Sequence, residues 1–404
     1  MLKDRRILLG VTGGIAAYKA AELVRELIRQ GAKVRVVMTE HACRFVTPLT
    51  FETLSGNPVS TDLFGSASNF EISHISLADF SELVILAPAT ANVIGKMAAG
   101  VADDLLTTVL LATTAPVLIC PAMNSKMYAN PVVKENIQSL LSRGHAVLEP
   151  GYGELACRYE GQGRLADVRE IVEESVALLT AKDLSEEHIL VTAGPTQEPL
   201  DPVRYITNYS SGKMGYALAI MARRRGAFVT LVSGPTELPV PKGVAFVPVK
   251  TAIEMRDAVM GRLAKATVVI KAAAVADYRP EECKKLKIKK NEEKMTVSLK
   301  RNPDILAEIA KKKGHRILVG FSMESDHVVE NARKKLLKKG MDFIVANDVT
   351  EPGAGFQVDT NVVWILDREG GEEKLPLMDK MDVAGAILDR VKQVKQSGKG
   401  CDGR

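Results

Sequence analysis

The chain has 404 residues, 46% of them hydrophobic and 25% charged, and a formal net charge of +5 at pH 7. This composition excludes a disordered or fibrous chain and is typical of a globular protein with about two domains. Lys3 to Arg6 lead directly into a short strand-like run, and no apolar stretch is long enough to span a membrane, so we expect a cytoplasmic protein without a membrane partner.

The five cysteines show neither a CxxC pair nor the spacing of a metal site; they are Cys43, Cys120, Cys157, Cys283 and Cys401. Free thiols and no zinc are therefore expected. Any cysteine with a function would act alone.

In the first half of the chain, apolar strand-like runs alternate with helical patterns. Arg6 to Val11 precedes a helical pattern from Ile15 to Gln30, and further strand-like runs cover Val34 to Met38, Leu83 to Ala87 and Val117 to Cys120. Buried strands separated by helices are typical of a parallel sheet. The first half is therefore predicted to form a parallel α/β domain.

The pattern lapses near Thr180 to His188 and then starts again. New strand-like runs cover Ile189 to Gly194, Phe228 to Val232, Val268 to Lys271, Ile317 to Gly320 and Phe343 to Ala346. We predict two Rossmann-like (flavodoxin-like) α/β domains, each with three layers and a mainly parallel sheet, over residues 1–182 and 189–395. Residues 183–188 are expected to be a linker, and residues 396–404 a disordered tail.

Both predicted domains begin with a glycine-containing turn between a strand and a helix. The first turn holds Gly13 and Gly14, and the second is Gly194-Pro195-Thr196. Backbone N–H groups at a helix start attract phosphate, but neither turn fits the GxGxxG pattern, and residues 210–215 fail the P-loop pattern. A mononucleotide or flavin phosphate at the first turn and a plain tight turn both remain open.

Polar residues follow two of the apolar runs in the first half. Thr90 and Asn92 come after one of them, and Met123 and Asn124 come after the next. Ligands of parallel sheets bind at the carboxyl ends of the strands, which favours a site here. The alternative is that Asn124 caps a helix and Met123 fills the core.

Residues 151–164 are rich in glycine and contain Cys157. This segment is either a flap that carries a functional thiol or a plain surface loop.

The basic excess lies entirely in the second half. It is concentrated at Lys284, Lys285, Lys287, Lys289 and Lys290, at Lys311 to Lys313, and at Lys334, Lys335, Lys338 and Lys339. Few aromatic residues are interleaved, so the phosphates of a small molecule suit these lysines better than nucleic acid, and solvated surface is the alternative for each run.

Together, these motifs resemble those of two enzyme families. Thr12 to Lys19, His74, Pro88 to Asn92, Pro121 to Met127 and Leu155 to Arg164 resemble the flavin-dependent cysteine decarboxylases. Gly194 to Thr196, Asp201 to Gly215, Ala272 to Pro280 and Lys287 to Lys290 resemble phosphopantothenate-cysteine ligase. In this order they resemble the bifunctional coenzyme A biosynthesis proteins, in which the two enzymes are fused, over nearly the whole chain.

The first resemblance implies FMN-dependent oxidative decarboxylation of phosphopantothenoylcysteine to 4'-phosphopantetheine. Oxidation of the substrate thiol to a thioaldehyde provides an electron sink for the loss of CO2. By this resemblance His74 is the base of the oxidative step, Asn124 holds the substrate carboxylate beside Met123, and Cys157 donates a proton in the final reduction. The residues expected to bind FMN are Gly13, Gly14, Ile15, Thr39, Thr90, Ala91 and Asn92.

The second resemblance implies CTP-dependent ligation of 4'-phosphopantothenate with cysteine through an acyl-cytidylate, with Mg²⁺. Lys287 is expected to stabilise the phosphate charge, Asn208 the acyl-cytidylate, and Arg204 the phosphate of phosphopantothenate. The expected CTP-binding residues are Ala273, Asp277, Lys287, Asn302, Pro303, Asp304, Ile305, Phe321, Lys335 and Lys339. Asp277 is also the candidate Mg²⁺ ligand, and turn or cap chemistry is the alternative for Asp277 and Asn302.

Two positions depart from the family pattern. Tyr128 stands where tryptophan is common, and Arg158 follows Cys157 where glycine is usual. These departures predict an altered substrate fit and a slower reductive step.

Several expectations stay open beside this interpretation. A flavoprotein of another chemistry, such as a flavin prenyltransferase, and a flavin-binding regulator without catalysis are the alternative functions, and ATP is the alternative nucleotide. The resemblance also implies a homo-oligomer with trimeric decarboxylase contacts and dimeric ligase contacts, which a dodecamer would satisfy.

Overall fold

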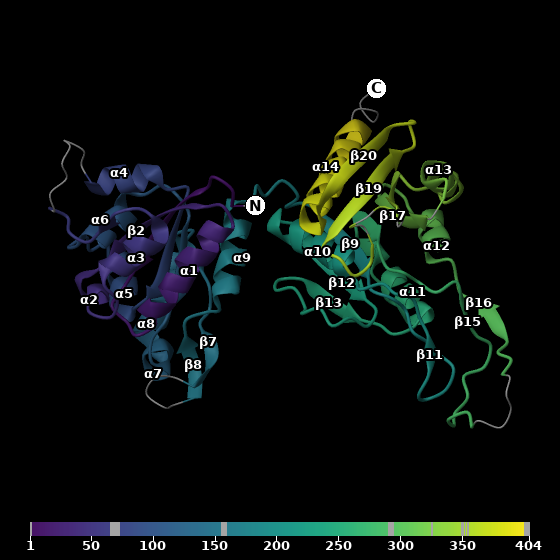
Figure 1. Cartoon of the computed structure of the whole chain (residues 1–404), viewed down its shortest axis with the longest axis horizontal. Coiled ribbons are helices and arrows are strands. Elements are labelled where there is room, and N and C mark those ends of the chain that lie inside the picture. Colours follow the sequence, from purple (N-terminus) through teal and green to yellow (C-terminus); the bar gives the residue numbers. More distant parts are fainter. Residues whose placement is uncertain are drawn as a thin grey trace. The chain divides into compact units, whose positions relative to one another are not determined.

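The computed structural model describes residues 2–64, 73–154, 160–289, 295–324, 326–348, 351, 353 and 355–399. The chain divides into two compact units, Met1–Thr180 and Ala181–Arg404, each with its own central sheet (Figure 1).

The first unit is built on a six-stranded parallel sheet in the order β3-β2-β1-β4-β5-β6. The strands are β1 (Arg6–Val11), β2 (Lys33–Met38), β3 (Val59–Ser60), β4 (Leu83–Ala89), β5 (Val117–Pro121) and β6 (Ala146–Val147). A separate antiparallel hairpin pairs β7 (Gly151–Glu154) with β8 (Glu160–Arg164). The helices are α1 (Ala17–Arg29), α2 (Glu40–Cys43), α3 (Pro48–Ser55), α4 (Ser73–Phe80), α5 (Ala91–Ala99), α6 (Leu105–Ala112), α7 (Ser125–Ala129), α8 (Pro131–Ser142) and α9 (Val168–Leu179).

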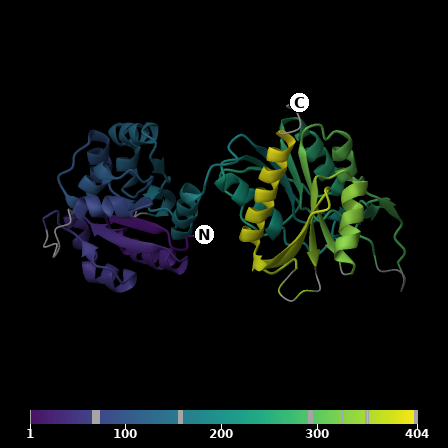
Figure 2. The same ribbon diagram turned by 90° about the horizontal axis from the view of Figure 1, so that it is seen from above.

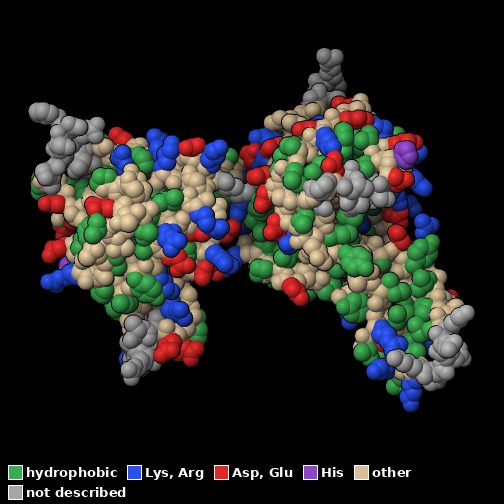
Figure 3. Space-filling view, in the orientation of Figure 1, with side chains coloured by type: hydrophobic (Ala, Val, Ile, Leu, Met, Phe, Trp, Pro, Cys, Tyr) green, Lys and Arg blue, Asp and Glu red, His purple; other side chains and the backbone are tan. Residues whose placement is uncertain are grey.

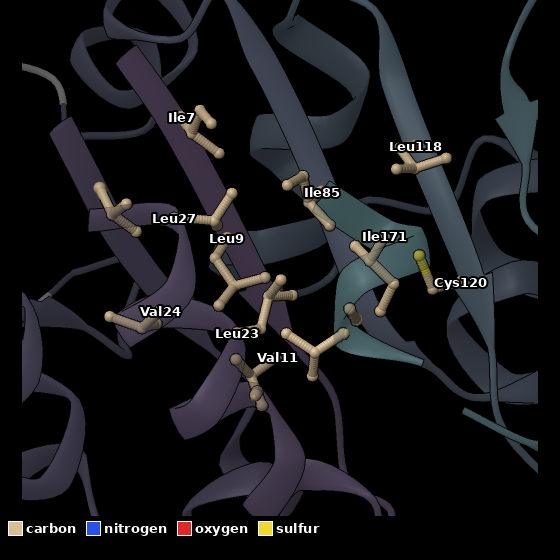
Figure 4. Close-up of a cluster of buried hydrophobic side chains, with 14 of the residues drawn as sticks. Ile7, Leu9, Val11, Leu23, Val24, Leu27, Ile85, Leu118, Cys120 and Ile171 are labelled. Atoms are coloured by element: carbon tan, nitrogen blue, oxygen red, sulfur yellow. The ribbon is translucent and has the colours of Figure 1, made fainter. Parts of the chain in front are cut away.

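Helices cover both faces of this sheet. On one face Leu9 and Ile85 from adjacent strands pack against Leu23 of α1 and Ile171 of α9 (Figure 4). On the other face, strand residues pack against α4, α5, α6 and α8. Burial on both faces explains why β1 is a nearly continuous apolar run in the sequence.

The second unit contains an eight-stranded sheet in the order β13-β12-β9-β14-β17-β18-β19-β20. The strands are β9 (His188–Ala193), β12 (Phe228–Ser233), β13 (Ala245–Pro248), β14 (Val268–Lys271), β17 (Ile317–Glu324), β18 (Phe343–Asp348), β19 (Thr360–Asp367) and β20 (Glu372–Asp379). Two short antiparallel pairs lie outside it: β10 (Glu198–Pro199) with β11 (Tyr205–Ile206), and β15 (Tyr278–Pro280) with β16 (Leu299–Arg301). The helices are α10 (Lys213–Arg224), α11 (Ala252–Met260), the 3-10 helix η1 (Leu263–Lys265), α12 (Ile305–Lys311), α13 (Val328–Lys338) and α14 (Lys380–Lys399).

This sheet also lies between two helical layers, which Figure 2 shows from a second direction. Helices α10 and α14 pack on one face, and α11, α12 and α13 pack on the other. The predicted fold class, two three-layer α/β domains with mainly parallel sheets, is therefore confirmed.

The sequence patterns missed the antiparallel end of the second sheet. Strands β18, β19 and β20 pair antiparallel. Most residues of β20 are exposed, with only Leu375 buried, because an edge strand with one solvated face carries little apolar signal.

The segment expected to be a linker, residues 183–188, instead packs on the second unit. Leu184 is buried in that unit's core, and Asp183 forms a two-point ion pair with Arg225, with 2.8 and 2.7 Å between the paired atoms. Glu187 is also buried and accepts a hydrogen bond from Thr267. The prediction was wrong because the charged residues that indicated a solvated linker have specific partners.

The predicted start of the disordered tail, at residue 396, is also too early. Helix α14 continues from residue 380 through 399, so residues 396–399 are helical, and residues 400–404 lie outside the described part. Val391 is buried and Val394 packs beside it, so core contacts support the last turns of a lysine- and glutamine-rich helix. No helix in the described part is both long and apolar enough to cross a membrane.

Candidate functional site

Each sheet reverses its strand order at one point, and the candidate sites lie there. In the first unit, the chain leaves β1 towards β2 on one side and later returns to β4 on the other. In the second unit, β9 has β12 on one side and β14 on the other. Connections diverge at such switch points, which leaves a crevice at the carboxyl ends of the two strands.

In the first unit, Thr12 joins the two loops that border this crevice. Its side chain is fully buried; the hydroxyl donates to the carbonyl of Pro88 at 2.6 Å and accepts from the N–H of Thr90 at 3.1 Å. The loops after β1 and β4 are thereby held side by side.

The helices that start at this crevice lack side-chain caps. Neither Ala16, before α1, nor Thr90, before α5, supplies a cap hydrogen bond, whereas Asp104, Asn130 and Asp167 cap α6, α8 and α9. Two uncapped helix starts at one crevice offer backbone N–H groups and positive dipole ends to an anion.

Most of the residues predicted to bind FMN border this crevice. Gly13, Gly14 and Ile15 lie between β1 and α1, and Thr90, Ala91 and Asn92 lie where β4 passes into α5. The Ile15 side chain is exposed, so it presents an apolar surface beside the turn. Thr39 differs, because it follows β2, is buried, and caps α2 through a bond from Ala42.

Asn124 follows β5 and precedes α7. It can cap the helix and still be available to a ligand. Its Oδ1 accepts a hydrogen bond from the N–H of Lys126 at 2.9 Å, which caps α7. The cap fixes the orientation of the side chain and uses its carbonyl end. A positioned amide at the carboxyl edge of the sheet remains suited to hold a substrate carboxylate.

The β7–β8 hairpin docks on the segment around Asn124. The carbonyl of Gly163 accepts a bond from the N–H of Met123 at 3.0 Å. A Cβ added at Gly163 would lie 2.2 Å from the carbonyl oxygen of Met123, and one at Gly161 would lie 2.9 Å from the Cβ of Ser125. Glycine at both positions is therefore required for the backbones to approach this closely.

A polar network provides a second link between α7 and this hairpin. The hydroxyl of Tyr128, a buried residue of α7, donates to the carboxylate of Glu149. The side chain of Gln162 in β8 donates to the same carboxylate at 3.2 Å. Burial and the neighbouring carboxylate raise the pKa of Tyr128, so the hydroxyl stays protonated as a donor.

Of the other two residues predicted to act in decarboxylation, only His74 lies in the described part of the chain. His74 lies in the first turn of α4 and is half-buried. Cys157 and the neighbouring Arg158 lie outside the described residues.

In the second unit, the crevice opens into a cavity of about 360 Å³. Its walls come from the start of α10, the segment after β14, the carboxyl end of β17 and residues near β19 and α14. The residues are Ser210, Ser211, Gly212, Lys213, Met214, Gly215, Lys271, Ala272, Ala273, Ala274, Val275, Asp277, Phe321, Ser322, Met323, Lys335, Asn347, Gly355, Phe356, Asn361 and Lys380.

Threonine hydroxyls also join the loops at this second crevice. Thr192 and Thr196 accept bonds from the N–H groups of Ala273 and Ala276, at 3.1 and 3.0 Å. Asn208 adds to the link, because its amide donates to the carbonyl of Ala274 at 2.7 Å. Helix α10 follows these loops, and its start at Gly212 lacks a side-chain cap.

Of the residues predicted to bind CTP, four line the cavity: Ala273, Asp277, Phe321 and Lys335. Asn302 is adjacent, since its N–H donates to the carbonyl of Asp277 at 2.8 Å and its side chain bonds to Ala276 and Arg279. Asp304 caps α12 and pairs with Lys339, and Ile305 is a core residue. Pro303 lies between Asn302 and Asp304 and is not among the lining residues.

Three lysines that the sequence analysis did not single out line the same cavity: Lys213, Lys271 and Lys380. Lys213 and Lys271 stand alone among apolar or small residues, and Lys380 lies beside Asp379, so no run of lysines marks any of them. Their one available signal was position, because Lys271 ends β14 and Lys213 begins α10.

The cavity changes the acidity of two of these lysines. Desolvation lowers the pKa of Lys271 to about 8; Lys339 adds to this effect and Asp277 opposes it. Desolvation, with help from Lys213, likewise lowers the pKa of Lys380 to about 8. Polyanion binding would favour the charged form of both.

Lys287 lies instead on an exposed arm between β15 and β16, at whose end lysine and arginine side chains gather (Figure 3). The arm meets the segment that contains Arg204: the N–H of Ile288 donates to Asp201 at 3.1 Å, and Arg204 donates to the carbonyl of Ile288 at 3.3 Å. Although burial opposes it, three bonds from backbone N–H groups keep the pKa of Asp201 below its usual value. The contacts place Lys287 in the same neighbourhood as Arg204.

No cluster of three or more His, Cys, Asp or Glu side chains suited to a metal ion occurs within the described ranges. Cys43, Cys120 and Cys283 are free thiols. Asp277 is thus a single carboxylate beside cationic side chains, an arrangement that suits a magnesium ion held mainly by phosphates.

Comparison with known proteins gives matches over both units. Residues 1–180 match the family model described as Flavoprotein, and residues 184–394 match that of the DNA/pantothenate metabolism flavoprotein C-terminal domain. The chain is 51% identical to Coenzyme A biosynthesis bifunctional protein CoaBC of Bacillus subtilis (strain 168), over 99% of this chain and 100% of the relative. It is 47% identical to the Escherichia coli (strain K12) protein of the same name, over 96% of this chain and 97% of the relative.

One solved structure that is similar to the second unit is the C-terminal domain of Coenzyme A biosynthesis bifunctional protein CoaBC, at 40% identity. The match covers 54% of this chain and all of that structure, with a TM-score of 0.47. Because the curated relatives match both halves in one order over nearly their full length, the chain belongs to the family of bifunctional coenzyme A biosynthesis proteins.

Proposed function

We propose that the two crevices catalyse two consecutive steps of coenzyme A biosynthesis. The second unit joins 4'-phosphopantothenate to cysteine with CTP, and the first decarboxylates the product, phosphopantothenoylcysteine, to 4'-phosphopantetheine. The observation that carries this proposal is one crevice with uncapped helix starts and a second lined by lysines, within one chain of this family.

In the ligase reaction, the carboxylate of phosphopantothenate attacks the α-phosphorus of CTP and pyrophosphate leaves. Lys213, Lys271 and Lys335 line the cavity and are suited to hold the triphosphate, and Lys287 on its arm would stabilise the charge that develops. The amine of cysteine then attacks the acyl carbon, and CMP leaves. Asn208 would stabilise the acyl-cytidylate, and Arg204 would bind the phosphate of phosphopantothenate.

Phe321 lines the cavity and would contact the base, with Asn302 to Ile305 and Lys339 completing the nucleotide site. Mg²⁺ would enter with the nucleotide and be held by its phosphates and Asp277, where it spreads the triphosphate charge. CTP is proposed over ATP by family likeness, and ATP serves as the comparison in the assay below.

In the decarboxylase reaction, the chain's residues bind and orient the substrate. The amide of Asn124, fixed by its capping bond, would hold the carboxylate that leaves as CO2, with Met123 beside it. His74 would take the proton of the substrate thiol, and Cys157 would return a proton in the final reduction.

FMN fits the first crevice by the chemistry of its borders. Uncapped starts of α1 and α5 suit one phosphate, and Ile15 offers an exposed apolar surface for a ring. Bound FMN would supply the oxidant for the substrate thiol and return the electrons afterwards. Gly13, Gly14, Thr90, Ala91 and Asn92 would surround it, with Thr39 in a supporting position.

The assembly proposed for the chain is a homo-oligomer with trimeric contacts of the first unit and dimeric contacts of the second, and mass measurement in solution tests it. Cytoplasmic localisation stays a prediction. A flavoprotein of another chemistry is disfavoured, because the curated relatives include a ligase-type second half over the same residues.

The test is a complete reaction with purified full-length protein. Phosphopantothenate, cysteine, Mg²⁺ and either CTP or ATP are supplied, and pyrophosphate, CO2 and phosphopantetheine are measured. All three products are expected with CTP. Yellow, flavin-loaded protein that forms none of them would contradict the proposal.

A further inference from the structure

Ser322 is a buried polar residue in the strand β17, within the largely apolar stretch 318–323. Its exposed fraction is 7%, and its Oγ has no hydrogen-bond partner among the described residues. Buried hydroxyl groups nearly always have a partner, because an unpaired one loses its hydration without compensation. The side chain therefore calls for a functional explanation.

Ser322 lies at the wall of the nucleotide cavity. Side chains alternate along a strand, so Ser322 shares a face with Leu318, which packs in the cluster that includes Leu336 of α13. Ser322 and Lys335, also of α13, both line the cavity. Ser322 thus lies at the wall of the same cavity as a lysine predicted to bind nucleotide, and rotation about its Cα–Cβ bond can turn the buried hydroxyl towards that cavity.

Several other polar side chains around this cavity differ from Ser322, because protein groups satisfy them. Ser211 donates to the carbonyl of Phe356. Lys380 donates to the carbonyls of Gly355 and Val358. The amide of Asn361 donates to Asn347 at 2.8 Å.

We propose that Ser322 binds the nucleoside triphosphate, with its hydroxyl donating to the nucleotide that occupies the cavity. This inference rests on the proposed ligase function and assigns a contact that the sequence motifs did not. The hydroxyl lacks a partner without nucleotide and gains one with it. Its presence therefore lowers the stability of the free protein and raises the affinity for nucleotide.

The proposal makes two measurable effects of Ser322→Ala opposite in sign. Removal of an unpaired buried hydroxyl should raise the melting temperature of the nucleotide-free, full-length protein by about 1–4 °C. The same substitution should weaken CTP binding by about three- to tenfold, measured by titration calorimetry. A residue with only a structural role would not shift the two quantities in opposite directions.

Ser211→Ala is the matched control for stability, since it removes a hydroxyl from the same cavity that does have a protein partner. Its melting temperature should fall. The proposal is overturned if Ser322→Ala leaves CTP affinity unchanged, or if it lowers the melting temperature.

Titration of the wild-type protein with CTP and with ATP separates this inference from the proposed function. If the wild type binds CTP and Ser322→Ala binds it equally well, only the role of Ser322 fails. If the wild type binds neither nucleotide, the ligase function fails and the inference fails with it.

Discussion

The crevices of the two units have the same topology but differ in how they attract an anion. In the first unit, the uncapped starts of α1 and α5 meet at the crevice. In the second, one uncapped helix start, at Gly212, is joined by lysines, including Lys213, Lys271 and Lys335. Backbone N–H groups suffice for a single phosphate, whereas a triphosphate requires added cationic charge.

The two crevices share one feature, which is that threonine side chains join the two loops of each crevice. Thr12 links the loops after β1 and β4, and Thr192 and Thr196 link those after β9 and β14. In each crevice, a threonine hydroxyl accepts a hydrogen bond from a backbone N–H group across the switch point. This bond holds both loops beside the same crevice. The comparison teaches that topology places the site, while a few side chains decide which charge it holds.

Among the variants that test how each crevice is built, the largest effect is expected from Gly163→Ala, which alters the first crevice and spares the second. The new Cβ would lie 2.2 Å from the carbonyl oxygen of Met123, so β8 and the segment around Met123 must separate. A shift of about 1 Å near a reacting group lowers the rate by about 100-fold. CO2 release from phosphopantothenoylcysteine measures this loss.

Gly151→Ala in the same hairpin is the control, because its nearest neighbours lie 3.9 Å away. It should retain near-normal decarboxylation, and both variants should release pyrophosphate at the wild-type rate. Normal CO2 release by Gly163→Ala would disprove the proposed close docking of β8.

The converse test is Lys271→Met, which removes one charge from the second crevice. Loss of a charge-assisted contact should weaken CTP binding by about 10- to 100-fold, while FMN content is unchanged. Lys311→Met, at an exposed position of α12, is the control. Equal CTP affinity in the two variants would remove Lys271 from the triphosphate site.

The lowered pKa values predict that nucleotide binding at the second crevice depends on pH. With the pKa of Lys271 and Lys380 each at about 8 in the free protein, raising the pH from 7 to 9 should weaken CTP binding by up to about tenfold per lysine. Binding near pH 8 should take up protons, which calorimetry in two buffers measures. Lys271→Met should show a smaller pH dependence, and an unchanged one would contradict the assignment.

The same shifts have a defined sign for stability. A lysine whose pKa is lowered in the folded protein, from 10.5 to about 8, leaves the unfolded chain with more bound protons between these values. This linkage therefore adds stability as the pH rises through that range.

The smallest effect is expected from Tyr128→Phe, which tests the polar link between α7 and the hairpin. Loss of the bond to Glu149 should lower the free energy of unfolding by about 1 kcal/mol, measured by denaturant unfolding. Tyr152→Phe, which alters an exposed tyrosine in the same hairpin, should leave it unchanged. If both variants unfold alike, the network adds nothing to stability.

The sequence predicted the parallel strands well because burial on both faces leaves continuous apolar runs, as in β1 and β14. It failed where the signal depends on partners distant in the chain. Asp183 looked like part of a solvated linker, yet it pairs with Arg225 and Lys392. Such pairing follows from tertiary packing and leaves no local pattern.

The candidate sites also contain residues that the sequence could place and residues that it could not. Asn124 could be placed at a strand end from the sequence, and the structure adds that it caps α7. Lys271 and Ser322 could not be found, since Lys271 is a single polar residue at the end of an apolar strand and Ser322 is a single hydroxyl within the largely apolar stretch 318–323. The roles proposed for them depend on the fold, which brings both to one cavity.

The central claim, that each crevice performs one of two consecutive reactions, is tested most directly by two variants measured side by side. Asn124→Ala should release pyrophosphate normally from CTP, phosphopantothenate and cysteine but form no CO2. Lys287→Ala should lose pyrophosphate release yet decarboxylate added phosphopantothenoylcysteine at the wild-type rate, and a mixture of the two should restore phosphopantetheine formation. Loss of both activities in either flavin-loaded, folded variant would contradict the account.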